Sequence, residues 1–252
     1  MPNHFTVLIP SKGRPECPTA KLLDGQDFKI IVEPQDLEAY KKIWGGKRLL
    51  LLPEDNFGLR NVRNWYLDYA EKNNLGWTWV MDDDLTNFYQ TAGKNNVRCN
   101  FQKVRDHVEP LLRKSNKFAI AALEYQQFAW SMNGRMPLNS YCDTCVIINM
   151  PLLRKLGIKY DVEQFKEDRD IVLQVLSKGS NSIRFSKFSF AAPENGSNAG
   201  GLHELYKQKS PEREGAFKLA EKWGEQIATV NIKPNGRVDA KINWKHFDRK
   251  KK

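Results

Sequence analysis

The sequence predicts an α/β domain built on a mixed, mostly parallel sheet flanked by helices. In the first half of the chain, short apolar runs alternate with segments of helical periodicity. Residues 77–81 form an aromatic and β-branched run with the pattern of a buried strand, and it ends directly in Asp82, Asp83 and Asp84. Ligands of open α/β sheets bind just beyond the carboxyl ends of strands, so we expect the functional site there.

The first half of the chain predicts an alternation of strands and helices. Strands are expected over residues 4–10, 28–32, 48–52 and 77–81. Proline, glycine or acidic residues follow each run and close it. Helices are expected over 37–43, which Asp36 can cap, and over 59–72, where the apolar side chains share one face.

The second half mixes elements at longer spacings. Strands are expected over residues 118–123, 143–149 and 183–190, and helices over 104–114, 151–156, 171–176 and 217–223. Residues 193–201 are rich in glycine, asparagine and serine and predict a loop. Cys142 and Cys145 have the spacing of a metal knuckle, but no second pair accompanies them, so we expect two buried thiols instead.

The net charge indicates the class of partner. Forty Lys and Arg against thirty Asp and Glu give a formal charge of +10, which favours polyanionic partners. Much of the excess lies in a basic C-terminal extension, residues 226–252, where Trp244 stands among basic residues and Lys250, Lys251 and Lys252 end the chain. This composition is typical of a nucleic-acid-contacting tail, and equally of a disordered solubilising tail.

Membrane insertion is not expected. No apolar run approaches the roughly 18–20 residues that span a bilayer. The N-terminal residues also lack the basic and apolar regions of a signal peptide. We therefore expect a cytoplasmic protein.

The acidic triplet predicts a metal site. Adjacent carboxylates repel one another, so a positive partner is expected opposite them. Mn²⁺ and Mg²⁺ take oxygen ligands and are commonly held by one or two carboxylates together with substrate phosphates. The alternatives are an acidic, solvated turn and a cap for a helix that begins at Thr86.

Four motifs together resemble the GT-A glycosyltransferases over roughly residues 4–206. They are a strand that ends in Ile9-Pro10-Ser11 with Arg14 close behind, Gly58 followed by Arg63-Asn64 on a helix, the Asp82-x-Asp84 at a strand end, and the downstream Glu167-Asp168. The last pair resembles the Glu-Asp of the inverting branch. The whole-chain pattern further resembles the phage TET-associated glycosyltransferases, which are linked to sugar addition on oxidised methylpyrimidines in DNA.

This resemblance implies an inverting hexosyltransferase that moves a sugar from a nucleoside diphosphate donor, with UDP favoured, to a hydroxymethylated pyrimidine in DNA. It implies a GT-A domain over 1–225, with a nucleotide-sugar half (1–90) and an acceptor half (91–225). The residues expected to contact the nucleotide sugar are Pro10, Ser11, Arg14, Glu33, Arg63, Asn64, Asp82 and Asp83.

The same resemblance implies catalytic and metal roles. Asp168 is expected to act as general base, with Glu167 beside it. Asp84 is expected to be the first ligand of Mn²⁺ or Mg²⁺, with Asp82 and, from across the site, His203 as further ligands. Trp130, Tyr141 and Trp244 are candidates for stacking on bases.

Several alternatives remain open. Asp168 could serve only to favour the N-terminus of its helix, and a retaining enzyme would not use it as base. His203 could be an ordinary surface histidine, and Glu33 a loop carboxylate. The acceptor could be a protein or polysaccharide. Less favoured is a nucleotidyltransferase, for which residues 11–14 would be a thin phosphate loop. A nucleic-acid-binding module without activity would leave the acidic triplet unexplained.

Overall fold

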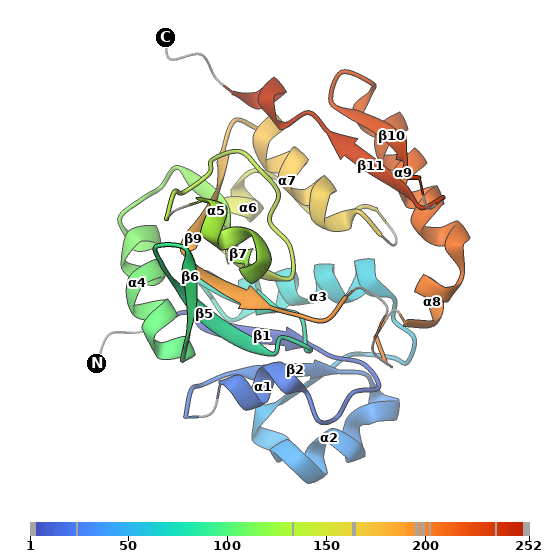
Figure 1. Cartoon of the computed structure of the whole chain (residues 1–252). Coiled ribbons are helices and arrows are strands. Elements are labelled where there is room, and N and C mark those ends of the chain that lie inside the picture. Colours follow the sequence, from blue (N-terminus) through green and yellow to red (C-terminus); the bar gives the residue numbers. More distant parts are fainter. Residues whose placement is uncertain are drawn as a thin grey trace.

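The computed structural model describes residues 4–23, 25–132, 134–162, 165–194, 197, 200–201, 203–234 and 236–248 (Figure 1). The strands of its main sheet are β1 (Thr6–Pro10), β2 (Lys29–Val32), β3 (Leu49–Leu51), β4 (Trp77–Met81), β5 (Asn87–Ala92), β6 (Asn95–Cys99), β7 (Phe118–Tyr125), β8 (Cys145–Asn149) and β9 (Asn181–Ala191). The α-helices are α1 (Pro18–Leu22), α2 (Leu37–Trp44), α3 (Leu59–Lys72), α4 (Phe101–Arg113), α5 (Gln126–Met132), α6 (Met150–Lys155), α7 (Glu167–Ser177), α8 (His203–Lys207) and α9 (Lys209–Trp223).

The main sheet is mixed, with the strand order β3-β2-β1-β4-β8-β7-β9-β5-β6. Its N-terminal half, β3-β2-β1-β4, is parallel, so the carboxyl ends of these strands lie along one edge. β8 runs antiparallel to β4, which brings the residues before β8 to that same edge. The contact is direct, because the Asp82 amide donates to the Thr144 carbonyl at 2.9 Å. The predicted α/β class and the predicted strands of the first half are confirmed.

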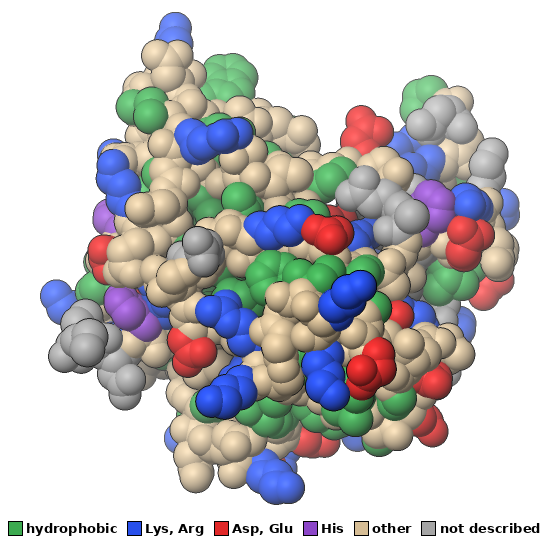
Figure 2. Space-filling view, turned by 90° about the horizontal axis from the view of Figure 1, so that it is seen from below, with side chains coloured by type: hydrophobic (Ala, Val, Ile, Leu, Met, Phe, Trp, Pro, Cys, Tyr) green, Lys and Arg blue, Asp and Glu red, His purple; other side chains and the backbone are tan. Residues whose placement is uncertain are grey.

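The positive charge is dispersed on the face that Figure 2 presents. Lysine and arginine side chains stand there among acidic and apolar ones instead of forming one continuous patch. None of the described helices combines the length and the apolar character needed to cross a bilayer.

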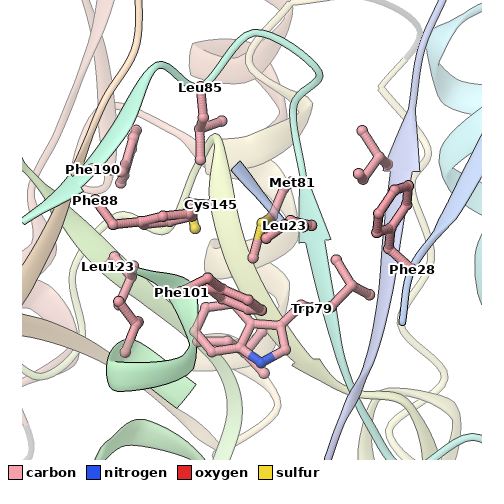
Figure 3. Close-up of a cluster of buried hydrophobic side chains, with 14 of the residues drawn as sticks. Leu23, Phe28, Trp79, Met81, Leu85, Phe88, Phe101, Leu123, Cys145 and Phe190 are labelled. Carbon is pink, nitrogen blue, oxygen red and sulfur yellow. The ribbon is translucent and has the colours of Figure 1, made fainter. Parts of the chain in front are cut away.

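The core lies on both faces of the sheet. Along β1, Val7 and Ile9 point into one apolar cluster, whereas Leu8 points into the other. The first cluster is covered by α1, α2 and α4, and Figure 3 shows Trp79 of β4 packed against Phe101 of α4 within it. The second is covered by α3, α6 and α7. Helices therefore cover both faces, as a parallel sheet requires.

Two parts of the fold differ from the sequence expectations. The residues after the acidic triplet do not begin a helix at Thr86. They lead into β5, which pairs with β6 at the edge of the sheet. The C-terminal extension is not a disordered tail over its described part. It folds into an antiparallel hairpin, β10 (Ala228–Ile232) and β11 (Val238–Ile242), followed by a 3₁₀ turn, η3 (Trp244–Phe247).

The expectation of two buried thiols is confirmed. Cys142 and Cys145 are both buried and free. Burial raises the pKa of the Cys142 thiol above its ordinary value, because a thiolate would lose its hydration there. The two thiols are therefore neutral core groups.

Candidate active site

The three carboxylates of the acidic triplet contact different partners at the carboxyl ends of the parallel strands. Asp82 lines a small pocket together with Asp143 and Asp168. Asp83 is buried and turned toward the loop after β1. Asp84 is half-buried, with its Oδ2 atom 3.4 Å from Nη1 of Arg14. The positive partner that the repulsion between these carboxylates requires is thus supplied in part by an arginine of the chain.

Asp83 anchors the loop that follows β1. Its carboxylate accepts hydrogen bonds from the Ser11 hydroxyl and from the guanidinium of Arg14. The Tyr40 hydroxyl extends this network, since it lies 2.6 Å from Ser11 Oγ and accepts from the Arg14 amide at 3.0 Å. Burial raises the pKa of Asp83 to about 6, and the hydrogen bond from Ser11 opposes that rise. Ser11 and Arg14 are therefore held at the triplet by contact with its middle residue.

The backbone of the triplet is fixed by α1. The Thr19 hydroxyl donates to the Asp82 carbonyl at 2.6 Å and accepts from the Leu85 amide at 2.9 Å. The Thr19 amide donates to the Asp83 carbonyl at 3.1 Å. One buried threonine thus spans the turn that carries all three carboxylates and holds its backbone.

Glu33 directly follows β2 at the same edge and is 2% exposed. One carboxylate oxygen lies 2.9 Å from Nζ of Lys12, and the carboxylate also accepts from the Phe57 backbone amide at 3.1 Å and from Nε2 of Gln35 at 2.6 Å. Burial alone would raise the pKa of Glu33, but the hydrogen bond from Lys12 and the backbone donors outweigh it and lower the pKa. Glu33 therefore enters the site as an ionised, fully partnered carboxylate.

Arg63 and Asn64, which are adjacent on α3, contact different parts of the structure. Nη2 of Arg63 lies 2.8 Å from Oε1 of Glu167. The Asn64 amide instead donates to the Tyr160 carbonyl at 2.7 Å and accepts from the Tyr160 amide at 2.9 Å. Arg63 therefore faces the acidic edge, whereas both ends of the Asn64 side chain hold the chain segment before α7.

The first turn of α7 presents Glu167 and Asp168 to this edge. Asp168 lines the pocket that Arg63, Asp82 and Asp143 also line. Glu167 is buried, and burial raises its pKa while the Arg63 guanidinium opposes the rise. The two predicted catalytic carboxylates and the first member of the triplet are thus brought together from α7 and β4.

Asp143 is a site residue that the sequence reasoning missed. It was placed only as the first residue of a strand. Burial, together with the charges of Asp168 and Asp82, raises its pKa to about 8. Its approach to Asp82 depends on the antiparallel pairing of β8 with β4. The one available signal was an acidic residue at the start of a strongly apolar run, and β8 itself begins two residues later, at Cys145.

The predicted metal ligands are of the types that Mn²⁺ and Mg²⁺ bind, but the structure does not bring them together as a complete metal site. The carboxylates of Asp82 and Asp84 are the oxygen donors that Mn²⁺ and Mg²⁺ prefer. His203 begins α8, with its Nε2 atom 3.8 Å from Oε1 of Glu204. Over the part of the chain that the structure describes, no group of three or more histidine, cysteine or acidic side chains is arranged to hold a metal ion.

The other predicted contacts have varied positions. Pro10 is the last residue of β1. Trp130 of α5 is 51% exposed, whereas Tyr141 is half-buried and stacks under Arg184, whose Cζ atom is 3.7 Å from the ring centroid. Trp244 packs against the apolar cluster of the C-terminal hairpin. Lys250, Lys251 and Lys252 lie outside the described residues.

Comparison with known proteins identifies a family. A family profile described as TET-Associated Glycosyltransferase matches residues 5–201. Among curated proteins, none matches the sequence significantly.

Solved structures show more distant similarity. A197 from STIV is 14% identical, with 76% of this chain and 86% of that chain covered and a TM-score of 0.47. A putative nucleotide-diphospho-sugar transferase from Desulfovibrio desulfuricans G20 is 11% identical. The match covers 71% of this chain and 78% of that chain, with a TM-score of 0.43. GalNAc-T7 with UDP, GalNAc and Mn²⁺ is 11% identical. The match covers 79% of this chain and 46% of that chain, with a TM-score of 0.45. With TM-scores this low, the predicted GT-A class is supported by the family match and the sheet topology.

Proposed function

The chain belongs to the TET-associated glycosyltransferase family, and from this premise we propose that it transfers a hexosyl unit from a nucleoside diphosphate sugar to a hydroxymethylated pyrimidine in DNA. UDP is the favoured nucleotide of the donor. The observation that carries the proposal is the meeting of Asp82, Asp168 and the Arg63–Glu167 ion pair at the carboxyl edge of the parallel strands.

The donor half of the site is formed by the loop after β1 and the triplet. Asp84 and Asp82 would hold Mn²⁺ or Mg²⁺, with His203 as the third protein ligand from the start of α8. When bound, the cation neutralises charge on the leaving diphosphate. Arg14 already lies beside Asp84 and can pair with a phosphate through its planar guanidinium. Glu33 stands at the end of β2, where a nucleoside would lie across the strand ends.

The transfer step needs a base and a fixed geometry. The acceptor hydroxyl oxygen attacks the anomeric carbon, the bond from that carbon to the diphosphate oxygen breaks, and the hydroxyl proton passes to the Asp168 carboxylate. The products are the glycoside with inverted configuration and the nucleoside diphosphate. The Arg63–Glu167 ion pair fixes the turn from which Asp168 projects. A positioned carboxylate of this kind contributes roughly 10²–10⁴-fold to a proton-transfer step.

The DNA acceptor is supported by charge and by exposed aromatic side chains. The net charge of +10 favours a polyanion. Phe128 and Trp130 on α5 are 47% and 51% exposed, and they can stack on unpaired bases. A pyrimidine in a duplex must leave the base stack before its hydroxymethyl group can enter a cleft, at a cost of a few kcal/mol. Stacking and phosphate contacts would offset this cost.

The runner-up is a protein or polysaccharide acceptor, and one experiment separates the two. The protein is incubated with Mn²⁺, a panel of nucleoside diphosphate sugars, and hydroxymethylated or unmodified oligonucleotides. We expect the mass of the hydroxymethylated strand to rise by one hexosyl unit per modified base, and the unmodified strand to gain nothing. Labelling of a peptide or glycan but of neither oligonucleotide would establish the runner-up.

A further inference from the structure

The C-terminal unit, defined as α9, β10, β11 and η3, packs along α7. Figure 1 shows it beside that helix. Leu173 of α7 is fully buried in an apolar cluster whose other buried members, Ala216, Leu219, Val238 and Ala240, belong to α9 and β11. The family profile ends at residue 201, so this unit lies outside the matched region. It is nevertheless part of the environment of α7.

Polar contacts concentrate on the first turn of α7. Nζ of Lys166, whose side chain is 8% exposed, lies 2.8 Å from Oδ1 of Asp239 and 3.1 Å from Oε1 of Glu212. Arg169 holds the same Asp239 with both terminal nitrogens, at 2.8 Å and 3.3 Å, and also donates to the Ala240 carbonyl. One carboxylate of β11 thus binds two cations of the α7 start, and the Arg169 contact has the bidentate geometry of a strong pair.

A third anchor follows directly. Asp170 is 1% exposed, and its carboxylate accepts from the indole of Trp223 at 2.7 Å and from Nζ of Lys222 at 2.9 Å. Both partners belong to the last turn of α9. Residues 166, 169 and 170 are therefore held by the C-terminal unit.

The two residues between these anchors face the other way. Glu167 pairs with Arg63 across the site, and Asp168 lines the pocket with Asp82. The first turn of α7 is thus divided, with one side bound by the C-terminal unit and the other directed to the acidic edge. Because a helical turn is stiff, a shift of the bound side would move Asp168 as well.

Through Arg169, the C-terminal unit affects the charge around Asp168 as well as its position. The charge of Asp168 lies close enough to raise the pKa of Arg169, although burial acts in the opposite direction. Among the described contacts, no hydrogen bond or ion pair joins Arg169 to Asp168, because the guanidinium is engaged by Asp239 and Ala240. Without the Asp239 charge, Asp168 and Asp143 would be the acidic groups that still act on the charge of Arg169. A base paired with an arginine is a poor proton acceptor.

We infer that Asp239 is a positioning residue for the transfer step: it holds Lys166 and Arg169 at the start of α7 and so keeps the guanidinium of Arg169 off Asp168. This inference rests on the proposed role of Asp168 as the base. It assigns the C-terminal unit to the catalytic centre instead of to a tail that only contacts nucleic acid.

The test compares variants of the full-length chain. Asp239→Asn should lower kcat for transfer at least tenfold while the KM for the donor stays within twofold, because the donor half is untouched. Asp239→Glu should recover most of the loss. Glu221→Gln, which removes the same charge from an exposed position of α9, should match the wild-type chain. Removing the guanidinium in the Asp239→Asn, Arg169→Gln double variant should raise kcat above that of Asp239→Asn alone.

The double variant separates positioning from a loss of folding. If Asp239→Asn leaves kcat unchanged, or if kcat falls and Arg169→Gln rescues none of it, the inference is wrong. Hydrogen exchange of the peptide over residues 166–177 gives a readout without activity, and Asp239→Asn should speed exchange there more than Glu221→Gln does. If the wild-type chain transfers no sugar, the proposed function fails, and unchanged exchange in Asp239→Asn would independently refute the positioning role.

Discussion

Arg63 and Glu167 form an ion pair of 2.8 Å that joins α3 to α7 beside the acidic edge. Their side chains are 16% and 7% exposed. Removal of one partner would therefore leave a largely buried charge without its counter-ion. The pair links the helix that follows the third strand to the helix that carries the proposed base, so it couples the two halves of the site mechanically.

Breaking this pair should destabilise the fold more than breaking an exposed pair. Arg63→Gln is expected to reduce the free energy of unfolding by about 3–5 kcal/mol, the usual cost of leaving a buried charge unpaired. The exposed Arg154–Glu71 pair supplies the control, because Arg154→Gln should cost less than about 1 kcal/mol. Urea unfolding of both variants measures the difference. Adding Glu167→Gln to Arg63→Gln should restore part of the loss, and strictly additive losses would contradict a coupled pair.

Asp84→Ala should abolish Mn²⁺-dependent binding of UDP without unfolding the protein, since the side chain is half-buried at the sheet edge and not in the core. Titration calorimetry with and without a chelator measures the effect. Asp27→Ala is a suitable control, because Asp27 is exposed and precedes β2, at the opposite edge of the sheet. Equal UDP affinity in Asp84→Ala and the wild-type chain would remove Asp84 from the metal site.

Asp168→Asn should lower the rate of sugar transfer by about 10²–10⁴-fold, because an amide cannot accept the acceptor proton. Donor affinity should persist, since the proposed nucleotide contacts lie on the loop after β1, the end of β2, α3 and the triplet, and not on Asp168. The rate is followed by mass spectrometry of the hydroxymethylated strand, and the anomeric configuration of the product by NMR. A product with retained configuration would rule out the inverting mechanism and, with it, this role for Asp168.

Glu33 should make the stability of the protein sensitive to acid. Its pKa in the folded state is lowered from an ordinary value of 4.5, so its contribution is present above that pH and is lost as the pH falls through the folded-state pKa. Glu33→Gln should therefore lose less stability than the wild-type chain between pH 5 and pH 3, in thermal unfolding without metal or nucleotide. Glu38→Gln, on the exposed face of α2, should follow the wild-type curve. Parallel curves for Glu33→Gln and the wild type would show that Lys12 does not stabilise the ionised form.

The parts of the fold that were predictable carry a strong local signal. Strand 77–81 and helix 59–72 are observed with the predicted bounds, because their apolar patterns are uninterrupted and glycine or asparagine precedes each. The β5–β6 hairpin was not predicted. Its strands are largely polar, and β6, the outermost strand of the sheet, has no buried residue. Asp36 was expected to cap α2, but its carboxylate accepts from the Gly13 amide at 2.8 Å instead.

The candidate site was predictable where its residues end parallel strands, because topology alone brings such ends together. The triplet and Ser11 follow this rule. The position of Asp143 depends on a long-range antiparallel register, which no local pattern encodes. A helix over 217–223 was predicted and lies within α9, but the packing of the C-terminal unit against α7 was missed, for a different reason. Its basic composition resembles that of a tail, and the two carboxylates that fix it to α7, Glu212 and Asp239, have partners more than 40 residues away.

The buried anchoring of Asp83 changes how the Asp-x-Asp motif of this chain should be compared with those of its relatives. The middle position is commonly written as a wildcard, yet here it receives the side chains of Ser11 and Arg14 from about 70 residues upstream. Positions 11, 14 and 83 are therefore coupled by direct contact, and a substitution at one should change the environment of the other two. A relative that replaces the middle acid should also replace the arginine, and a search pattern that scores the three positions together would separate such lineages.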